Sequence, residues 1–194
     1  MLFSSIPFLY WFLPVVLAAY FLVPKRMKNG VLLLASLLFY GWGEPRYVLL
    51  MLAAIAQGYG FGLLIGKYRG RPAAKVWLTA SVLLSFAALV YFKYADFFLT
   101  SFNALTGLSV PLLRAALPVG ISFYTFQIVS YLIDVYRGDA AAQRSFVDLA
   151  AYVAMFPQLI AGPIVRYSEV AQQLRTRTHS LSGAAYGAWR FVLG

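Results

Sequence analysis

Long apolar runs separated by short polar stretches make up almost the whole chain. A helix needs about 20 predominantly apolar residues to cross the hydrocarbon core of a bilayer. Five runs are candidates for such helices, and they cover residues 7–23, 31–42, 47–66, 76–98 and 118–136. The second run is short for a span, so it has to be extended or tilted. The pattern predicts an all-α, polytopic transmembrane protein.

A sixth apolar run, residues 146–165, is interrupted by Pro157 and by the pair Gly162 and Pro163. Such breaks free backbone groups that need partners inside a bilayer. A full crossing would also place the following arginines on the outer side, against the tendency of basic loops to stay inside. We therefore expect a re-entrant segment, with a kinked full crossing as the alternative. Beyond it, Ser168 is expected to cap a short helix that starts at Glu169.

Basic residues gather in the loops between the runs. Two of these loops together hold seven of the 16 Lys and Arg residues, namely Lys25, Arg26 and Lys28, and then Lys67, Arg69, Arg71 and Lys75. Both loops fall inside if the turn at 44–46 lies outside, so the N-terminus is predicted to face outward. The expected location is the bacterial inner membrane. This distribution explains the net charge of +10 without nucleic acid, whose binding needs basic residues clustered on one folded surface.

The overall composition supports the membrane interpretation. Hydrophobic residues make up 62% of the chain and charged residues 11%, against about 25% charged in an average soluble domain. A soluble fold with this composition would have an unusually apolar surface. The chain has no cysteine, which excludes disulfides, zinc thiolates and thiol nucleophiles.

Small and charged residues inside the runs suggest specific contacts. Gly58, Gly62 and Gly66 recur every fourth residue, which puts them on one helical face and permits close packing of another helix. The alternative is that these glycines are only tolerated in lipid. Lys93 and Asp96 are three residues apart, so they are expected to pair on one helix face near the membrane interface.

The run 118–136 carries the most informative polar residues. Gln127, Ser130, Asp134 and Arg137 fall on one stripe of an otherwise apolar helix. Asp134 has Arg137 three residues away as a ready partner. An ionisable residue within a membrane helix is a candidate functional site. The alternative is a structural pair that fixes the end of the helix at the interface.

His179 is the chain's single histidine, in a polar loop without a neighbouring acid. It lacks the partners that a general base or a metal ligand requires. The six acidic residues show neither a paired spacing for acid–base work nor a metal cage. From the residues alone, the sequence therefore predicts no catalytic and no metal-binding group.

Three motifs connect the chain with a known family. They are the segments 117–127 (LPVGISFYTFQ), 131–138 (YLIDVYRG) and 156–166 (FPQLIAGPIVR), and the opening MLFSS at 1–5 and YFLVP at 20–24 accompany them. With these motifs the chain resembles the membrane-bound O-acyltransferases. The nearest branch is that of the alginate O-acetylases and related polysaccharide O-acetyltransferases. The three motifs stand in the family's order along essentially the whole chain.

The resemblance implies that residues 1–194 form a single transmembrane domain, the N-terminal part of a longer enzyme with a tunnel or funnel through the membrane. Such an enzyme moves an acetyl or other acyl group from a donor on the cytoplasmic side, acetyl-CoA or an acyl carrier, to hydroxyls of an exported polysaccharide. Alginate is the leading acceptor. No covalently bound cofactor is implied. The expected partners are the lipid bilayer, the polysaccharide, and other membrane or periplasmic acetylation proteins.

The family's catalytic histidine is expected beyond Gly194, and His179 does not match its motif. No catalytic residue is therefore carried over to this chain. The resemblance implies instead a set of scaffold or tunnel-wall residues, namely Ser122, Gln127, Ser130, Asp134, Arg137, Pro157, Gln158, Gly162 and Pro163. Two other hypotheses remain. One is a transporter or channel that uses Asp134 as an ion or proton site, and the other is a non-catalytic, truncated membrane subunit.

Overall fold

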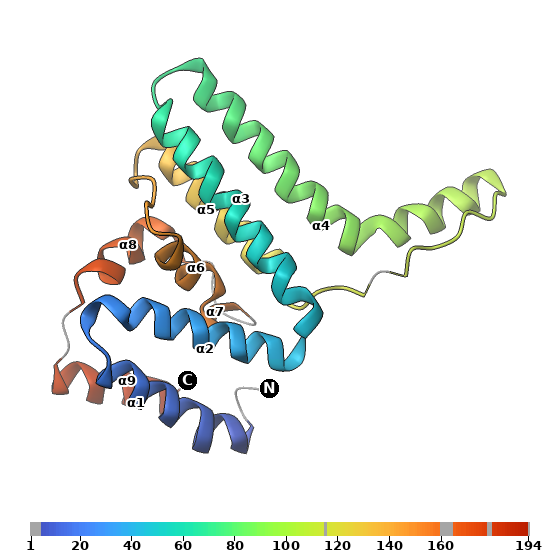
Figure 1. Cartoon of the computed structure of the whole chain (residues 1–194). Coiled ribbons are helices and arrows are strands. Elements are labelled where there is room, and N and C mark those ends of the chain that lie inside the picture. Colours follow the sequence, from blue (N-terminus) through green and yellow to red (C-terminus); the bar gives the residue numbers. More distant parts are fainter. Residues whose placement is uncertain (1–4, 115, 160–164, 178–179, 194) are drawn as a thin grey trace.

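Helices form almost the entire structure. The computed structural model describes residues 5–114, 116–159, 165–177 and 180–193, and these residues contain no strand. The helices are η1 (Phe8–Phe12), α1 (Leu13–Leu22), η2 (Lys25–Met27), α2 (Lys28–Gly43), η3 (Pro45–Tyr47), α3 (Val48–Lys67), α4 (Pro72–Thr106), α5 (Ile121–Arg137), α6 (Phe146–Ala154), α7 (Phe156–Leu159), α8 (Tyr167–Arg175) and α9 (Leu181–Leu193). Figure 1 shows their arrangement. The expected all-α class is confirmed.

Each of the five predicted spans contains a helix, although the boundaries differ. The largest difference is at α4, which begins at Pro72 and continues to Thr106 and so exceeds the predicted run 76–98 at both ends. Proline at the first helical position suits a helix start because its missing N–H is not needed there. In the part of the chain that is described, Pro45–Lys67 and Pro72–Thr106 are long and apolar enough to cross a membrane. The protein is therefore an all-α membrane protein.

The glycine stripe of α3 packs directly against α5. A Cβ atom added at Gly58 would lie 2.6 Å from the Ile128 side chain, and one at Gly62 would lie 2.5 Å from the Tyr131 hydroxyl oxygen. The third glycine of the stripe, Gly66, has equally little room, here against Ala142. The close packing predicted from the spacing is confirmed, and simple tolerance of glycine in lipid does not account for it.

Hydrogen bonds from helix tyrosines to loop carbonyls mark two different ends of the helix bundle. At one end, the hydroxyls of Tyr40 and Tyr47 donate to the carbonyls of Val119 and Ala116, at 3.0 and 2.7 Å. At the other end, the Tyr59 hydroxyl donates to the Arg144 carbonyl at 2.8 Å. The turn at 44–46 thus lies with the loop that precedes α5, whereas the basic loops lie at the opposite end.

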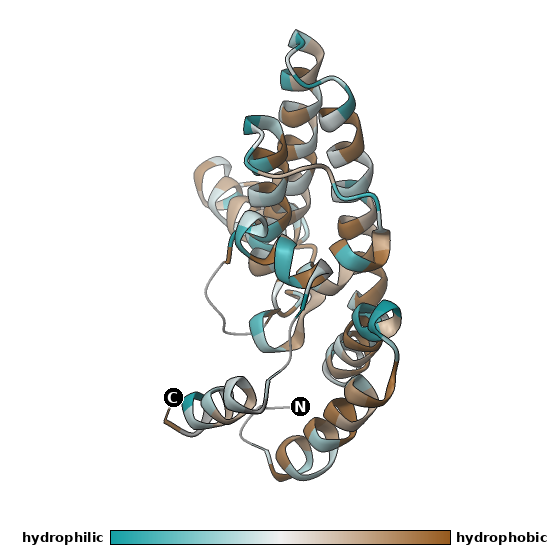
Figure 2. Cartoon of the chain, turned by 90° about the vertical axis from the view of Figure 1, so that its left-hand side faces the viewer, coloured by the Kyte–Doolittle hydropathy of each residue, from teal (hydrophilic) through white to brown (hydrophobic). Residues whose placement is uncertain are grey.

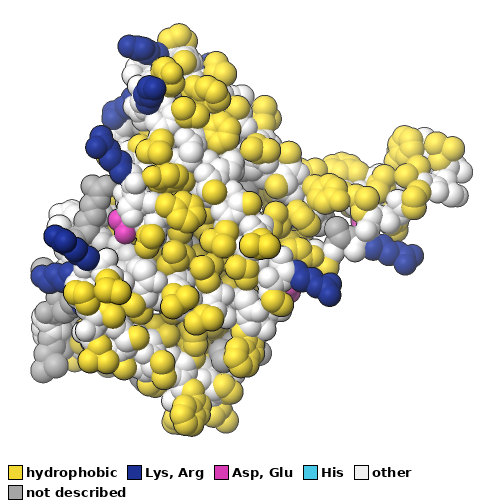
Figure 3. Space-filling view, in the orientation of Figure 1, with side chains coloured by type: hydrophobic (Ala, Val, Ile, Leu, Met, Phe, Trp, Pro, Cys, Tyr) yellow, Lys and Arg dark blue, Asp and Glu magenta, His cyan; other side chains and the backbone are white. Residues whose placement is uncertain are grey.

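The surface shows the same division. Figure 3 shows most of the visible Lys and Arg side chains along the left edge of the molecule and a smaller number on the right, while hydrophobic side chains cover most of the visible face. In Figure 2 the hydrophobic residues recur along the long helices and the hydrophilic residues gather toward helix ends and loops. Exposed hydrophobic side chains such as Leu83 and Trp42 are expected where a helix faces lipid.

The predicted ion pair between Lys93 and Asp96 is wrong. The described residues hold no such pair; the carboxylate of Asp96 instead accepts the backbone N–H groups of Leu113 and Arg114, at 2.8 and 2.9 Å. Arg114 has a positive φ of 49°, so this carboxylate holds an unusual turn of the chain against α4. A carboxylate that accepts two N–H bonds has little need of a cation.

Candidate functional site

The interrupted segment after α5 returns to the place where it began. The Gln143 side chain, which precedes α6, donates through Nε2 to the hydroxyl of Tyr167 in α8, at 2.8 Å. Further in, the Tyr152 hydroxyl donates to the Val165 carbonyl at 2.7 Å. The chain breaks at Met155 between α6 and α7. This closed path is the geometry that a re-entrant segment requires.

Helix α6 is too short to cross a bilayer. It has 9 residues, about 14 Å of helix, against a hydrocarbon core of about 30 Å. The Ser145 hydroxyl caps its start by accepting the Asp148 N–H at 3.3 Å. Yet residues 149–154 are completely or almost completely buried, so α6 lies inside the protein between α2 and α3. Where it stands relative to a bilayer remains a prediction.

Polar side chains join the returning segment to α5. The hydroxyl of Tyr131 accepts the backbone N–H of Gln143 at 3.0 Å, and the Gln143 Oε1 atom accepts the N–H groups of Arg144 and Ser145. The rings of Tyr131 and Tyr167 pack edge to face with centroids 4.9 Å apart. A buried network in which every group has a partner favours one arrangement of the chain. The sequence did not reveal this network, because Gln143 lies in an irregular loop with no periodic pattern.

Asp134 connects α5 to the start of α8. Its side chain is 5% exposed, and Oδ2 accepts the backbone N–H of Ser168 at 3.4 Å. Helix α8 begins at Tyr167 with Arg166 as its N-cap, so the predicted cap at Ser168 is two residues too late. A carboxylate at this place stabilises the N-terminus of a helix, where free N–H groups carry positive partial charge.

The predicted pair of Asp134 with Arg137 is also wrong. In the described part of the chain no ion pair links them, and Arg137 is exposed at the end of α5. The geometry therefore supports a structural role for Asp134, whose hydrogen bond to the Ser168 N–H links α5 to α8. Helix α5 nevertheless brings most of the predicted stripe to the protein interior, since Gln127 is buried and Ser122 and Ser130 are half-buried.

Two buried polar atoms on α5 lack a hydrogen-bond partner. They are the Tyr124 hydroxyl and the Oε1 atom of Gln127, whose side chains are 2% and 1% exposed. The two residues are three positions apart, so they lie on neighbouring turns of one helix face. Buried polar atoms without a partner carry a free-energy cost of about 1–3 kcal/mol each. They can bind a hydroxyl, an amide or a water molecule.

A cavity of about 390 Å³ lies between α1, α2, α8 and the break between α6 and α7. Most of its wall is apolar, including Leu13, Leu17 and Phe156, and the predicted site residue Gln158 also lines it. The ring of Phe156 in this wall packs edge to face against that of Phe12, with ring centroids 5.5 Å apart. A cavity of this size and character is suited to an apolar group such as an acyl chain.

Arg177 supplies the cavity's cationic group. Its guanidinium donates to the Tyr20 hydroxyl at 3.1 Å and to the Gln173 carbonyl at 3.1 Å, and it also donates to Asn29. The sequence analysis missed Arg177, because its partners lie on α1, α2 and α8 and only the fold brings them together.

The remaining predicted residues are placed as follows. Pro157 is exposed on α7, whereas Gly162, Pro163 and His179 lie outside the described residues. The described residues include no group of three or more potential metal ligands. They also provide no nucleophile–base pair around the cavity. Around the cavity, the described residues thus offer a mostly apolar wall with one cation, Arg177.

These features place the chain among all-α membrane proteins, with a buried segment that returns to its starting point and an apolar cavity. No family model matches the chain, and no solved structure matches it. Several curated proteins do match the chain. The chain is 44% identical over 200 residues to the probable alginate O-acetylase AlgI of Pseudomonas syringae pv. tomato, and 45% identical over 199 residues to that of Azotobacter vinelandii. A peptidoglycan O-acetyltransferase of Helicobacter pylori is 31% identical over 226 residues.

Every residue of the chain is included in these matches, which cover 38%, 40% and 43% of the three relatives. The chain thus spans about two fifths of the length of the curated relatives it matches. The resemblance seen in the motifs is confirmed: over its full length the chain is similar to polysaccharide O-acetyltransferases, with alginate O-acetylases among them.

Proposed function

We propose that the protein containing this chain is a membrane-bound O-acyltransferase that transfers acetyl groups to hydroxyls of an exported polysaccharide. The observation that carries this proposal is the similarity of the whole chain to alginate O-acetylases and to a peptidoglycan O-acetyltransferase. The chemistry common to these names is formation of an acetyl ester on a glycan. Alginate is the preferred acceptor, because the relatives named for it are the more similar ones, at 44% identity against 31%.

The reaction needs an activated acyl donor, and acetyl-CoA or an acyl carrier fits that requirement. The acetyl group leaves a thioester sulfur and forms a bond to the acceptor oxygen. A general base takes the hydroxyl proton, and the thiol departs. The chain spans about two fifths of the length of its curated relatives, and we assign this base to the part of the protein outside it. The cavity near Arg177 and the buried polar atoms of α5 then form part of the wall of the reaction chamber.

The transporter hypothesis is not favoured. Its main residue, Asp134, already serves the N-terminus of α8, and the similar proteins are named as acetyltransferases.

The function is tested by deleting the gene and measuring the acetyl-ester content of each envelope polysaccharide. We expect ester content to fall for one polymer and to recover when the full reading frame is restored. Residues 1–194 alone are expected to restore nothing. Unchanged esters on every polymer after deletion would refute the proposed function. Ester formation by residues 1–194 alone would instead refute the placement of the base.

We further propose that the protein lies in the inner membrane with its N-terminus outside and its basic end in the cytoplasm. The separation of the basic loops from the turn at 44–46 supports this orientation. Since the chain has no cysteine, single cysteines report sidedness without background.

Ser109→Cys is expected to react with a membrane-impermeant thiol reagent in intact spheroplasts. Arg71→Cys and Thr176→Cys are expected to react only after permeabilisation. Labelling of Thr176→Cys together with Ser109→Cys would mean that the segment before α8 crosses the membrane fully. Labelling of Arg71→Cys from outside would reverse the orientation. If the expected labelling is found, periplasmic partner proteins for acetylation are to be sought on the side that carries Ser109.

A further inference from the structure

A basic cleft of about 870 Å³ opens where the loop between α3 and α4 meets the end of α5. Seven residues line it, namely Arg69, Gly70, Arg71, Pro72, Lys75, Tyr136 and Arg137. Four of these seven residues are cations. The described residues place no carboxylate in the lining of the cleft. The nearby Asp139 lines a different cavity, together with Tyr167 and Ser168.

The cleft is built by the fold rather than by one stretch of sequence. Arg69 lies on the loop after α3, and its guanidinium packs closely over Gly138, so that a side chain there would have to displace it. Gly138 also has a φ of 89°, which a residue with a Cβ rarely adopts. A cation is favourable here because α5 ends at this point and its last carbonyls are free. Arg137 is thereby brought next to Arg71 and Lys75.

Among the described residues, nothing neutralises the positive charge of the cleft. The described residues contain no ion pair that involves Arg71, Lys75 or Arg137, and all three side chains are exposed. The start of α4 at Pro72, which has no side-chain cap, adds positive partial charge to the same cleft. A second basic cavity of about 480 Å³ shares Arg69 with the cleft and adds Lys67 and Arg144.

The cleft lies directly above apolar surface. Val76, one residue after Lys75, is 65% exposed, and Leu83, two turns further along the same face of α4, is also exposed. On α5, Phe126 is exposed and packs against Phe86 of α4. A ligand with an anionic head and apolar chains would satisfy both surfaces together.

We propose that this basic cleft binds a phosphate group, and that the phosphate is the headgroup of an anionic phospholipid whose acyl chains lie on α4. The four cations provide charge-assisted hydrogen bonds to the phosphate oxygens. A soluble phosphate compound such as coenzyme A shares the headgroup chemistry but would leave the apolar surface below uncovered. The site is independent of acetyl transfer, so the proposed function and the cleft can fail separately.

The test measures lipid binding to the full-length protein, purified in detergent and stripped of lipid, by native mass spectrometry and by competition. The probes are phosphatidylglycerol, phosphatidylcholine, coenzyme A and inorganic phosphate. We expect preferential binding of phosphatidylglycerol over phosphatidylcholine, without displacement by the two soluble compounds. Arg71→Gln with Lys75→Gln is expected to weaken this binding about a hundredfold, at about tenfold for each charge-assisted bond lost.

The matched control is Lys25→Gln with Arg26→Gln, which removes two exposed cations from another basic loop and is expected to change binding less than about threefold. The thermal midpoint of each variant without lipid shows whether it folds, and Arg137→Gln replaces the double variant if that one does not. Stronger binding of coenzyme A than of phosphatidylglycerol, lost in the same variants, would keep the phosphate site and overturn the lipid. Equal losses in control and cleft variants, or no preference between lipids, would overturn the site.

Discussion

Helices α4 and α5 are neighbours, yet α4 exposes many of its apolar side chains whereas α5 buries polar ones. Helix α4 has 35 residues and is rich in apolar side chains, but much of its surface is open, as at Leu83, which is 65% exposed. Helix α5 has 17 residues and carries Gln127 and Asp134, yet it is buried by α3, α4, α6 and α8, and Leu132 is 0% exposed. In a membrane protein, apolar surface faces lipid at no cost, so polar residues mark the interior better than apolar ones do.

The largest expected effect comes from truncating the same residue type on the two helices. Leu132→Ala leaves a cavity at the centre of the bundle and is expected to lower the free energy of unfolding by about 2–5 kcal/mol. Leu83→Ala removes a side chain that faces outward and should change it by less than about 0.5 kcal/mol. Denaturant titration in detergent micelles measures both. Equal losses would mean that α4 is covered in the assembled protein.

A second pair of substitutions compares the stability effect of an added methyl group on two faces of α3. Gly62→Ala forces a methyl group against the Tyr131 hydroxyl and is expected to cost about 1–3 kcal/mol through overpacking. Gly60→Ala meets nothing within 4 Å, and its higher helix propensity should stabilise α3 by up to about 1 kcal/mol. The comparison is made on thermal midpoints of the two variants. A Gly62→Ala variant as stable as the parent would show that α3 and α5 are not in close contact.

The smallest effect is expected from the two aspartates. Asp134→Ala leaves the Ser168 N–H without its buried acceptor and should cost about 1 kcal/mol. Asp96→Ala frees the N–H groups of Leu113 and Arg114, but both residues are exposed, so water replaces the carboxylate and the cost should stay below about 0.5 kcal/mol. Hydrogen exchange at Ser168 and at Leu113 separates local opening from global unfolding. A larger global loss for Asp96→Ala would contradict this ranking.

These aspartates also show where prediction from sequence ends. Spacing along one helix names the nearest cation as the partner, Lys93 for Asp96 and Arg137 for Asp134. The structure supplies backbone N–H groups instead, 17 or more residues further along the chain. Such partners depend on how helices pack, and no local pattern contains that information. The same limit hid the contact of Gln143 with Tyr167 and the role of Arg177.

Features that arise within one helix or one loop were predictable. The glycine stripe of α3 and the helix in each apolar run follow from periodicity and backbone chemistry, and the interruption of the run 146–165 was also expected, although it falls at Met155 and Pro157 lies inside α7. Boundaries were less accurate, because helix propensity continues past the apolar stretch when nothing stops it. Helix α4 runs through Asn103 and ends only before Gly107, whose φ of 71° suits a helix terminus. Helix α9, which begins at Leu181, was not foreseen because its first half is mostly small and polar.

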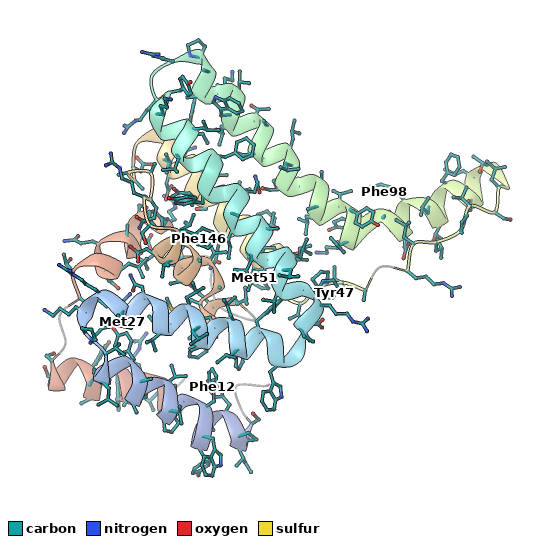
Figure 4. The ribbon with its side chains drawn as sticks, in the orientation of Figure 1. Phe12, Met27, Tyr47, Met51, Phe98 and Phe146 are labelled. Atoms are coloured by element: carbon teal, nitrogen blue, oxygen red, sulfur yellow. The ribbon has the colours of Figure 1, made fainter. Side chains whose placement is uncertain are left out.

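The length of α4 limits how the protein can stand in a membrane. Its 35 residues correspond to about 52 Å of helix, far more than the hydrocarbon thickness of about 30 Å. The helix changes direction near Phe98 (Figure 4), and the part before that bend is by itself long enough to cross. The remainder carries Phe98, Phe102 and Leu105, which are exposed. Because these exposed side chains are apolar, we expect the outer part of α4 to lie against lipid along the membrane surface rather than to extend straight into water.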